Sequence, residues 1–170
     1  MDVKLIELKK MKIASFQCEG PGAEAKVHKK LISWAMKNDL LKEEKKYHLY
    51  GFDNPMMTKE KPNGYELWLP IDRDIKESDG IKIKNFEGGI FLAREMTLKN
   101  FFTPDLGWKL LHPNLPWMKE NKYEIDWDKW PIGLEETIVD KNDIGKTSDW
   151  SLDQSKIPMI LYMRIKKVKD

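Results

Sequence analysis

An acidic and an aromatic side chain lie two residues apart in the segment from Tyr65 to Ile71 (YELWLPI). Successive side chains of a β-strand point to opposite faces, so Glu66 and Trp68 are expected to share one face. The other face carries apolar residues that suit packing beneath a helix. A carboxylate beside a ring attracts flat apolar molecules by stacking and cations through the negative ring face. The pair therefore indicates ligand binding.

A second segment with a similar pattern lies at residues 159–165 (MILYMRI), where Tyr162 takes the place of Trp68 at an offset of 94 (162 − 68). We expect Trp68 and Tyr162 to face each other across a pseudo-twofold axis, with Glu66 nearby. A carboxylate desolvated among rings should have a raised pKa and should favour a positively charged guest. The alternative is that Glu66 lies in solvent on an open sheet face, with Trp68 covering it.

The sequence is also rich in tryptophan, with seven Trp among 170 residues. Tryptophan concentrates in cores and in recognition pockets. Trp34 lies among apolar residues with helical spacing and is expected in the core. The remaining candidates for the walls of the pocket, beside Glu66, Trp68 and Tyr162, are Phe52, Trp108, Trp127 and Trp130.

Other kinds of chemical site find little support in the sequence. Cys18 is the only cysteine, and His28, His48 and His112 lack the spacing of metal ligands. Gly88-Gly89 is interpreted as a hairpin turn, because no phosphate-loop motif surrounds it. We therefore expect no cofactor and no metal, with haem bound by one of the histidines as the alternative.

Charge and hydropathy narrow the class of protein. Lys+Arg 30 against Asp+Glu 28 leaves a net charge of +2, which argues against a large phosphate-binding surface. The first strand is expected from Val3, which leaves no room before it for a helix-turn-helix. No signal-peptide run and no apolar stretch of about 20 residues occurs. A cytoplasmic protein without membrane or direct nucleic-acid contact is predicted.

Hydrophobic spacing predicts the elements that position these residues. Strands over residues 3–8 and 12–18 should form a hairpin, followed by an amphipathic helix over 23–41. A second helical region should begin at Asp105 and be divided into two short pieces by Pro113 and Pro116. The other predicted strands cover residues 47–52, 65–71, 81–86, 90–94, 131–139 and 157–167.

The order of these elements repeats along the chain. Ile81-Lys82-Ile83 resembles Val3-Lys4-Leu5 at an offset of 78 (81 − 3). We predict a single α/β domain of the α+β type over residues 1–170, built from β-β-α-β-β repeats at about 1–76 and 77–170. The two repeats should associate about a pseudo-twofold axis into an antiparallel sheet, with helices on one face and a ligand cleft on the other.

The passage from VKLIELKKMKIASFQCEGPG through LISWAMKNDLL to YGFDNP and GYELWLPI resembles the GyrI-like (gyrase-inhibitor-like) family. The later GIKIKNFEGGIFLA and GLEETI fit the same pattern. The family comprises effector-binding domains of multidrug-responsive MerR- and AraC-type activators and standalone proteins. The resemblance implies a tandem SHS2-type fold that binds lipophilic, often cationic, compounds. Its acidic position matches Glu66, and its aromatic neighbours match Trp68, Trp127, Trp130 and Tyr162.

Three functions remain open at this point. The first is a standalone protein that senses or sequesters planar or cationic lipophilic small molecules. The second, which the resemblance implies, is a hydrolase of electrophilic cyclopropane compounds, with Glu66 as general base and Tyr47, Tyr50 or Tyr162 as proton donor. The third is a protein-interaction module like the gyrase inhibitors, for which Glu66 would be dispensable and the partner would be another protein.

Overall fold

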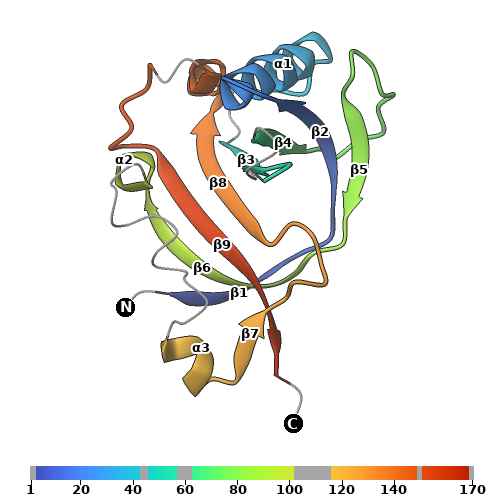
Figure 1. Ribbon diagram of the computed structural model, residues 1–170. Coiled ribbons are helices and arrows are strands. Elements are labelled where there is room, and N and C mark those ends of the chain that lie inside the picture. Colours follow the sequence, from blue (N-terminus) through green and yellow to red (C-terminus); the bar gives the residue numbers. More distant parts are fainter. Residues whose placement is uncertain (1–2, 43–45, 57–62, 102–115, 149–150, 169–170) are drawn as a thin grey trace.

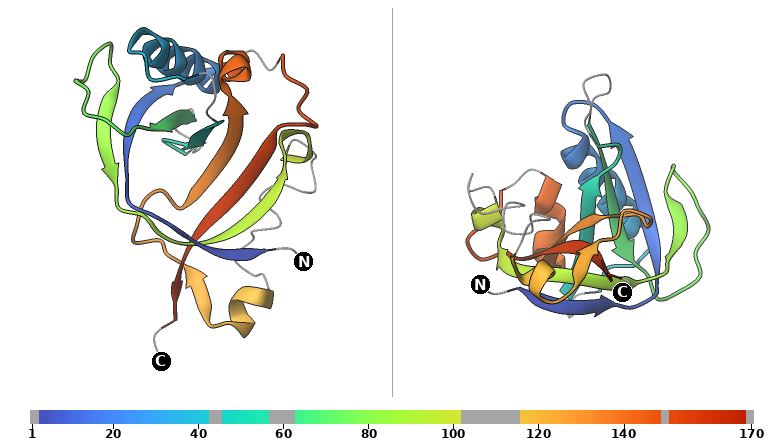
Figure 2. Two further views of the ribbon diagram at one scale, coloured as in Figure 1. Left: turned by 180° about the vertical axis from the view of Figure 1, so that it is seen from behind. Right: turned by 60° about the horizontal axis from the view of Figure 1, so that its bottom comes forward.

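The computed structural model describes residues 3–42, 46–56, 63–101, 116–148 and 151–168. Nine strands form one curled antiparallel sheet in the order β1-β6-β9-β8-β3-β4-β2-β5, with β7 added beside β9. Helix α1 lies across one end of the sheet, and α3 and β7 lie at the opposite end (Figures 1 and 2).

The elements have the following bounds: β1 (Lys4–Leu8), β2 (Met11–Glu19), α1 (Ala23–Lys37), β3 (Lys46–Asp53), β4 (Gly64–Pro70), β5 (Lys82–Phe86), β6 (Gly89–Thr97), α2 (Leu98–Phe101), α3 (Pro116–Glu120), β7 (Tyr123–Ile125), β8 (Gly133–Asp140), α4 (Lys141–Ile144) and β9 (Pro158–Lys167), with a short 3-10 turn at Gly145–Ser148.

The strand order has the internal symmetry that the sequence repeat predicts. If β1, β2, β3 and β4 correspond to β5, β6, β8 and β9, the order reads the same from both edges. The strand register has the same symmetry. In the first repeat Ile13 lies opposite Pro70, and in the second repeat their counterparts, Phe91 and Arg164, lie opposite each other. The α+β class and the tandem pseudo-twofold arrangement are confirmed; the division near residues 76 and 77 stays a prediction.

The expected hairpin of the first two strands is wrong. Strand β1 pairs with β6, and β2 pairs with β4 and β5. Leu8 lies opposite Gly89, and Met11 lies opposite Phe86. The β5–β6 segment therefore runs antiparallel to the β1–β2 segment with the same residue register in both ladders. Each repeat thus gives its first strand to the other. Gly88-Gly89 is likewise not a hairpin turn, because β5 and β6 pair with β2 and β1 instead.

Helix α1 covers part of one face of the sheet, as its spacing predicts. It ends at Lys37, four residues before the predicted end at Leu41. The side chain of Asn38 donates to the Trp34 carbonyl at 2.9 Å, and Asp39 adopts a φ of 52°. A left-handed residue at this position ends a helix, which explains the shorter span.

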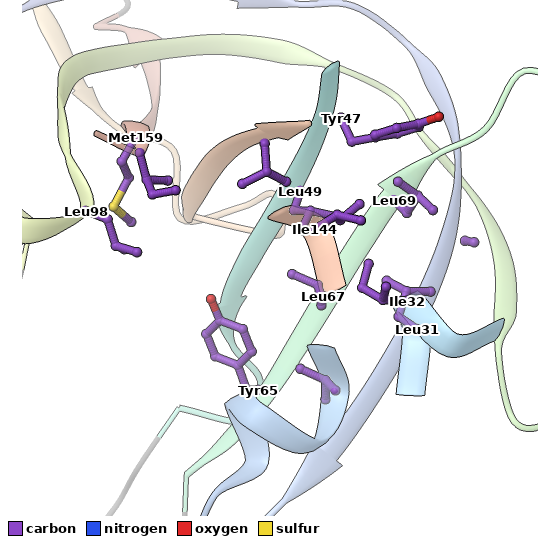
Figure 3. Packing of buried hydrophobic residues seen from close by; sticks show 14 of the residues in the cluster. Leu31, Ile32, Tyr47, Leu49, Tyr65, Leu67, Leu69, Leu98, Ile144 and Met159 are labelled. Carbon is purple, nitrogen blue, oxygen red and sulfur yellow. The ribbon is translucent and has the colours of Figure 1, made fainter. Parts of the chain in front are cut away.

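The main hydrophobic core lies between α1 and the sheet. Leu31 and Ile32 of α1 meet Leu67 and Leu69 of β4, as Figure 3 shows. Trp34 is buried here, as predicted. Because residues alternate along β4, the core takes one set of side chains and leaves Glu66 and Trp68 on the opposite, concave face of the sheet.

The region between β6 and β8 differs from expectation. The helix predicted from Asp105, with Pro113, lies outside the described residues, while α2 and α3 flank that gap. The short strand β7 and its pairing with β9 were not predicted. Among the described residues, no helix combines the length and the apolar character that crossing a membrane requires.

Candidate functional site

Glu66 is buried on the concave face and receives hydrogen bonds from four side chains. The Trp68 indole N–H and the Lys84 ammonium donate to Oε1 at 2.6 Å each. Ser15 donates to the same oxygen, and Asn54 donates to Oε2 at 2.7 Å. The residue as a whole is only 2% exposed. Glu66 is therefore an ionised carboxylate held in a fixed position.

These partners reverse the pKa direction that we expected from burial. Desolvation raises the pKa of Glu66, but hydrogen bonds from Lys84, Ser15, Trp68 and Asn54 together outweigh it and hold the pKa below the ordinary value. The expectation of a raised pKa is wrong, because alternation along one strand cannot show which donors the neighbouring strands supply. A carboxylate with a lowered pKa is a weak general base.

A second buried carboxylate, Glu136 of β8, lies on the same concave face. Tyr162 donates to Oε2, and His48 Nδ1 contacts Oε1. Desolvation raises the pKa of Glu136, yet hydrogen bonds from His48, Tyr162 and Tyr50 lower it overall. Glu136 was not among the site residues predicted from the sequence. The alternation in the GLEETI segment, where Leu134 and Glu136 share a face, is the signal that could have found it.

The aromatic residues of the concave face form one continuous cluster. Trp68 packs edge-on against Phe52 with centroids 4.9 Å apart, and Phe52 reaches Trp130 at 5.9 Å. In the other direction Trp68 reaches Phe86 at 5.4 Å. Phe91 then continues from Phe86 to Tyr162. Two phenylalanines thus fill the space in which Trp68 and Tyr162 were expected to face each other.

An open cleft of about 560 Å³ lies beside this cluster, and we call it the aromatic cleft. Three of the predicted ligand-binding residues, Glu66, Trp68 and Trp130, line it, and Trp130 is half exposed. Its other lining residues are Ile13, Asn54, Lys84, Asn85, Phe86, Glu87, Gly88, Gly89, Lys129, Pro131 and Arg164. The aromatic cleft therefore combines ring surface with charged groups.

The remaining predicted site residues lie elsewhere. Phe52 and Tyr162 are buried in the aromatic cluster behind the cleft. Trp127 is 66% exposed and does not line the cleft. Trp108 lies outside the described residues. Tyr47, one of the candidate proton donors, packs in the main core on the opposite face of the sheet.

Arg164 forms one wall of the aromatic cleft. Its guanidinium donates to the carbonyls of Pro131 and Gly88 at 3.0 Å each and lies 4.6 Å from the centre of the Phe91 ring. A Cβ atom at Gly89 would overlap with the guanidinium, and Gly89 has a φ of 147°. Gly89, which the sequence suggested was part of a turn, therefore has no side chain at the point where the Arg164 guanidinium packs against the backbone.

A smaller, enclosed cavity of about 20 Å³ lies on the other face of the sheet, near α1. Burial raises the pKa of Glu24 to about 7, helped by the charge of Asp53. Burial lowers the pKa of His28 to about 4, and its Nδ1 lies 3.0 Å from the Thr147 hydroxyl. Tyr65 donates to Glu135 at 2.9 Å. This cavity has the size of a single water molecule.

The two histidines that the structure describes lie on opposite faces of the sheet. His28 lies on the α1 face, His48 contacts Glu136 on the concave face, and His112 lies outside the described residues. Within the described ranges, no group of three or more His, Cys, Asp or Glu side chains has the geometry of a metal site.

Comparison with known proteins gives matches in structure only. No family model and no curated protein matches the sequence. The crystal structure of the EcmrR C-terminal domain matches with a TM-score of 0.66 at 13% identity, covering 98% of both chains. A structure described as a hydrolase from Listeria innocua matches with a TM-score of 0.61 at 10% identity, covering 96% of this chain and 91% of the other.

A third solved structure, that of SAV2435 bound to tetraphenylphosphonium, matches with a TM-score of 0.50 at 9% identity, covering 98% of this chain and 94% of the other. At sequence identities this low, structural similarity shows a shared fold and nothing about function. The nine-stranded curled sheet, its pseudo-twofold repeat and these structural matches agree with one another. The chain has the GyrI-like fold.

Proposed function

We propose that this protein binds lipophilic aromatic small molecules in the aromatic cleft, as a drug-sensing or drug-sequestering effector-binding protein. The observation that carries the proposal is the cleft itself, about 560 Å³ in volume, with Trp68, Trp130 and a fixed carboxylate in its walls. Ligand pockets in proteins commonly enclose about 300–1,000 Å³ and combine apolar walls with a few fixed polar groups.

The two tryptophans have different parts in this proposal. Trp68 is held by its hydrogen bond to Glu66 and by ring contacts with Phe52 and Phe86, and only 5% of the residue is exposed, so it contributes a small, fixed part of the cleft wall. Trp130 is half exposed and contacts Phe52, which also contacts Trp68. An aromatic ligand that stacks on Trp130 would bury apolar surface of both partners, which favours binding.

The structural relatives support a small-molecule ligand. One is the C-terminal domain of EcmrR, and another, SAV2435, is described as bound to the lipophilic cation tetraphenylphosphonium. We do not propose hydrolysis by Glu66, because a carboxylate that accepts four hydrogen bonds, one of them from the Lys84 ammonium, is a poor proton acceptor.

The test is a titration of the protein with lipophilic aromatic dyes of either charge, followed by quenching of tryptophan fluorescence. We expect saturable quenching. Trp130→Ala should weaken binding by about tenfold, since stacking on a ring contributes about 1 kcal/mol or more. Trp127→Ala is the matched control, because Trp127 lies three residues earlier and does not line the cleft. Equal losses in both variants, or no saturation with any dye, would contradict the proposal.

A further inference from the structure

The buried carboxylate of the aromatic cleft, Glu66, already has a cationic partner from the same chain. Lys84 of β5 lies 2.6 Å from Glu66 and also lines the cleft. Its side chain is about half exposed, while that of Glu66 is almost fully buried. A cationic ligand could reach Glu66 only by displacing Lys84 and sending its ammonium back to solvent. The ion pair therefore disfavours the ligands that a free buried carboxylate would attract.

Two rings of the aromatic cluster, Phe86 and Phe91, already have a cation beside them. The Arg164 guanidinium lies 4.6 Å from the Phe91 centroid and 5.5 Å from the Phe86 centroid. It is fixed there by hydrogen bonds to two carbonyl oxygens. A ligand cation above these rings would meet a like charge at close range, which opposes its binding.

The charges that remain in the aromatic cleft are positive. Its two carboxylates each have a lysine partner: Glu66 pairs with Lys84, and Glu87 pairs with Lys10 at 3.0 Å. Lys129 and Arg164 also line the cleft, and within the described residues neither has a carboxylate within 4.0 Å. Asp126 acts on Arg164 only at longer range.

We propose that the aromatic cleft selects lipophilic aromatic anions, such as aromatic carboxylates or sulfonates, with the negative group held near Arg164 and Lys129. This inference rests on the proposed function of the cleft and names the charge of its ligand. Arginine presents several N–H donors in a plane and is suited to pair with a carboxylate. The apolar part of the ligand would lie against Trp68 and Trp130.

The experiment compares two probes of nearly equal shape and opposite charge, tetraphenylborate and tetraphenylphosphonium. Their affinities are measured by tryptophan quenching and calorimetry at two salt concentrations. We expect the wild-type protein to bind tetraphenylborate at least about tenfold more tightly. In Lys84→Met, Glu66 loses its cationic partner but keeps its other donors, and the affinity for tetraphenylphosphonium should rise by about tenfold.

The matched control is Lys82→Met, on the same strand. It removes the same charge from the protein, but Lys82 pairs with Glu77 and does not line the cleft. A general effect of the lost charge would change the affinity for tetraphenylphosphonium equally in both variants. We expect a change only in Lys84→Met. The double variant Lys84→Met/Glu66→Gln should lose the gained affinity for the cation. Circular dichroism of each variant verifies that it is folded.

The outcomes separate this inference from the function on which it rests. Tighter binding of tetraphenylphosphonium by the wild type, equal binding of both probes, or equal effects of the two lysine variants would overturn the inference while leaving the cleft as a binding site. If neither probe, nor any dye in the earlier titration, gives saturable binding, the proposed function itself is wrong.

Discussion

The indole N–H of Trp68 donates to the carboxylate of Glu66 at 2.6 Å, and the two residues lie on the same strand. The ring and the acid of the aromatic cleft therefore form one structural unit, since neither can turn without breaking this bond. Ser15, Asn54 and Lys84 complete the unit from other segments.

The first prediction concerns the stability that Glu66 contributes. Glu66→Gln should lower the free energy of unfolding by about 2 kcal/mol at pH 7, since hydrogen bonds to a buried charged group are lost. Because the folded pKa lies below the ordinary value of 4.5, this contribution is complete above that value and is lost as the pH falls through the folded pKa. Urea unfolding at pH 7 and pH 3 measures both effects.

Glu87→Gln provides the control for this prediction, because Glu87 lines the same cleft but forms an exposed ion pair with Lys10. Exposed pairs contribute little. If the two variants have the same stability at pH 7, the buried network around Glu66 does not stabilise the fold.

The second prediction concerns Glu24 on the opposite face of the sheet. Burial raises its pKa from 4.5 to about 7, so the folded state binds a proton more tightly than the unfolded state does. The free energy of unfolding therefore falls, through this group, as the pH rises from about 4.5 to 7. Glu24→Gln should be more stable than wild type at pH 8, by about 2 kcal/mol after allowance for partial solvent screening, with a smaller gain at pH 5.

Chemical denaturation at both pH values measures this gain. A gain that is equal at pH 5 and pH 8 would mean that ionisation of Glu24 is not its cause.

The third prediction concerns the second carboxylate. Tyr162→Phe removes a hydrogen bond to Glu136, so the pKa of Glu136 should rise and the free energy of unfolding should fall by about 2 kcal/mol. Carboxyl carbon resonances followed through a pH titration report the pKa. Tyr123→Phe is the control, because Tyr123 stacks on Trp117 away from the concave face. An unchanged Glu136 resonance in Tyr162→Phe would refute the assignment of this bond.

The fourth prediction concerns the close approach of two strands. A Cβ atom at Gly51 of β3 would overlap with the ring and hydroxyl of Tyr65 on β4. Gly51→Ala should therefore cost at least about 2 kcal/mol of stability, because the buried tyrosine has to move. At Gly145 a Cβ atom would meet its nearest neighbour, Met36, at 3.5 Å, an ordinary contact. Gly145→Ala should leave the midpoint of thermal unfolding nearly unchanged, and similar losses in both variants would contradict this account.

The sequence predicted which residues of one strand share a face, but it did not predict which residues of other strands contact them. Alternation within one strand was enough to put Glu66 and Trp68 on one face, and the offset between repeats was enough to anticipate the symmetry of the sheet. Apart from Trp68, the donors to Glu66 come from β2, from β5 and from Asn54 just after β3, so their positions depend on the pairing of distant strands. Lys84 in particular looks like an ordinary surface lysine in the sequence.

The exchange of first strands was missed for a related reason. Lys9-Lys10 and Gly88-Gly89 each separate two strand-like segments by about the length of a tight turn, which favours a hairpin in a local interpretation. In the folded sheet, β1 pairs with β6 and β5 pairs with β2, so each first strand extends the part of the sheet that belongs to the other repeat. This pairing depends on contacts between residues far apart in the sequence, so a local sequence pattern cannot predict it.

This exchange has a consequence during synthesis. Strand β1 is synthesised before its partner β6, which begins at Gly89, so the nascent chain has to carry β1 unpaired until the second repeat emerges. Neither repeat can complete its part of the sheet alone, and fragments cut near the middle should recover the native structure only when mixed.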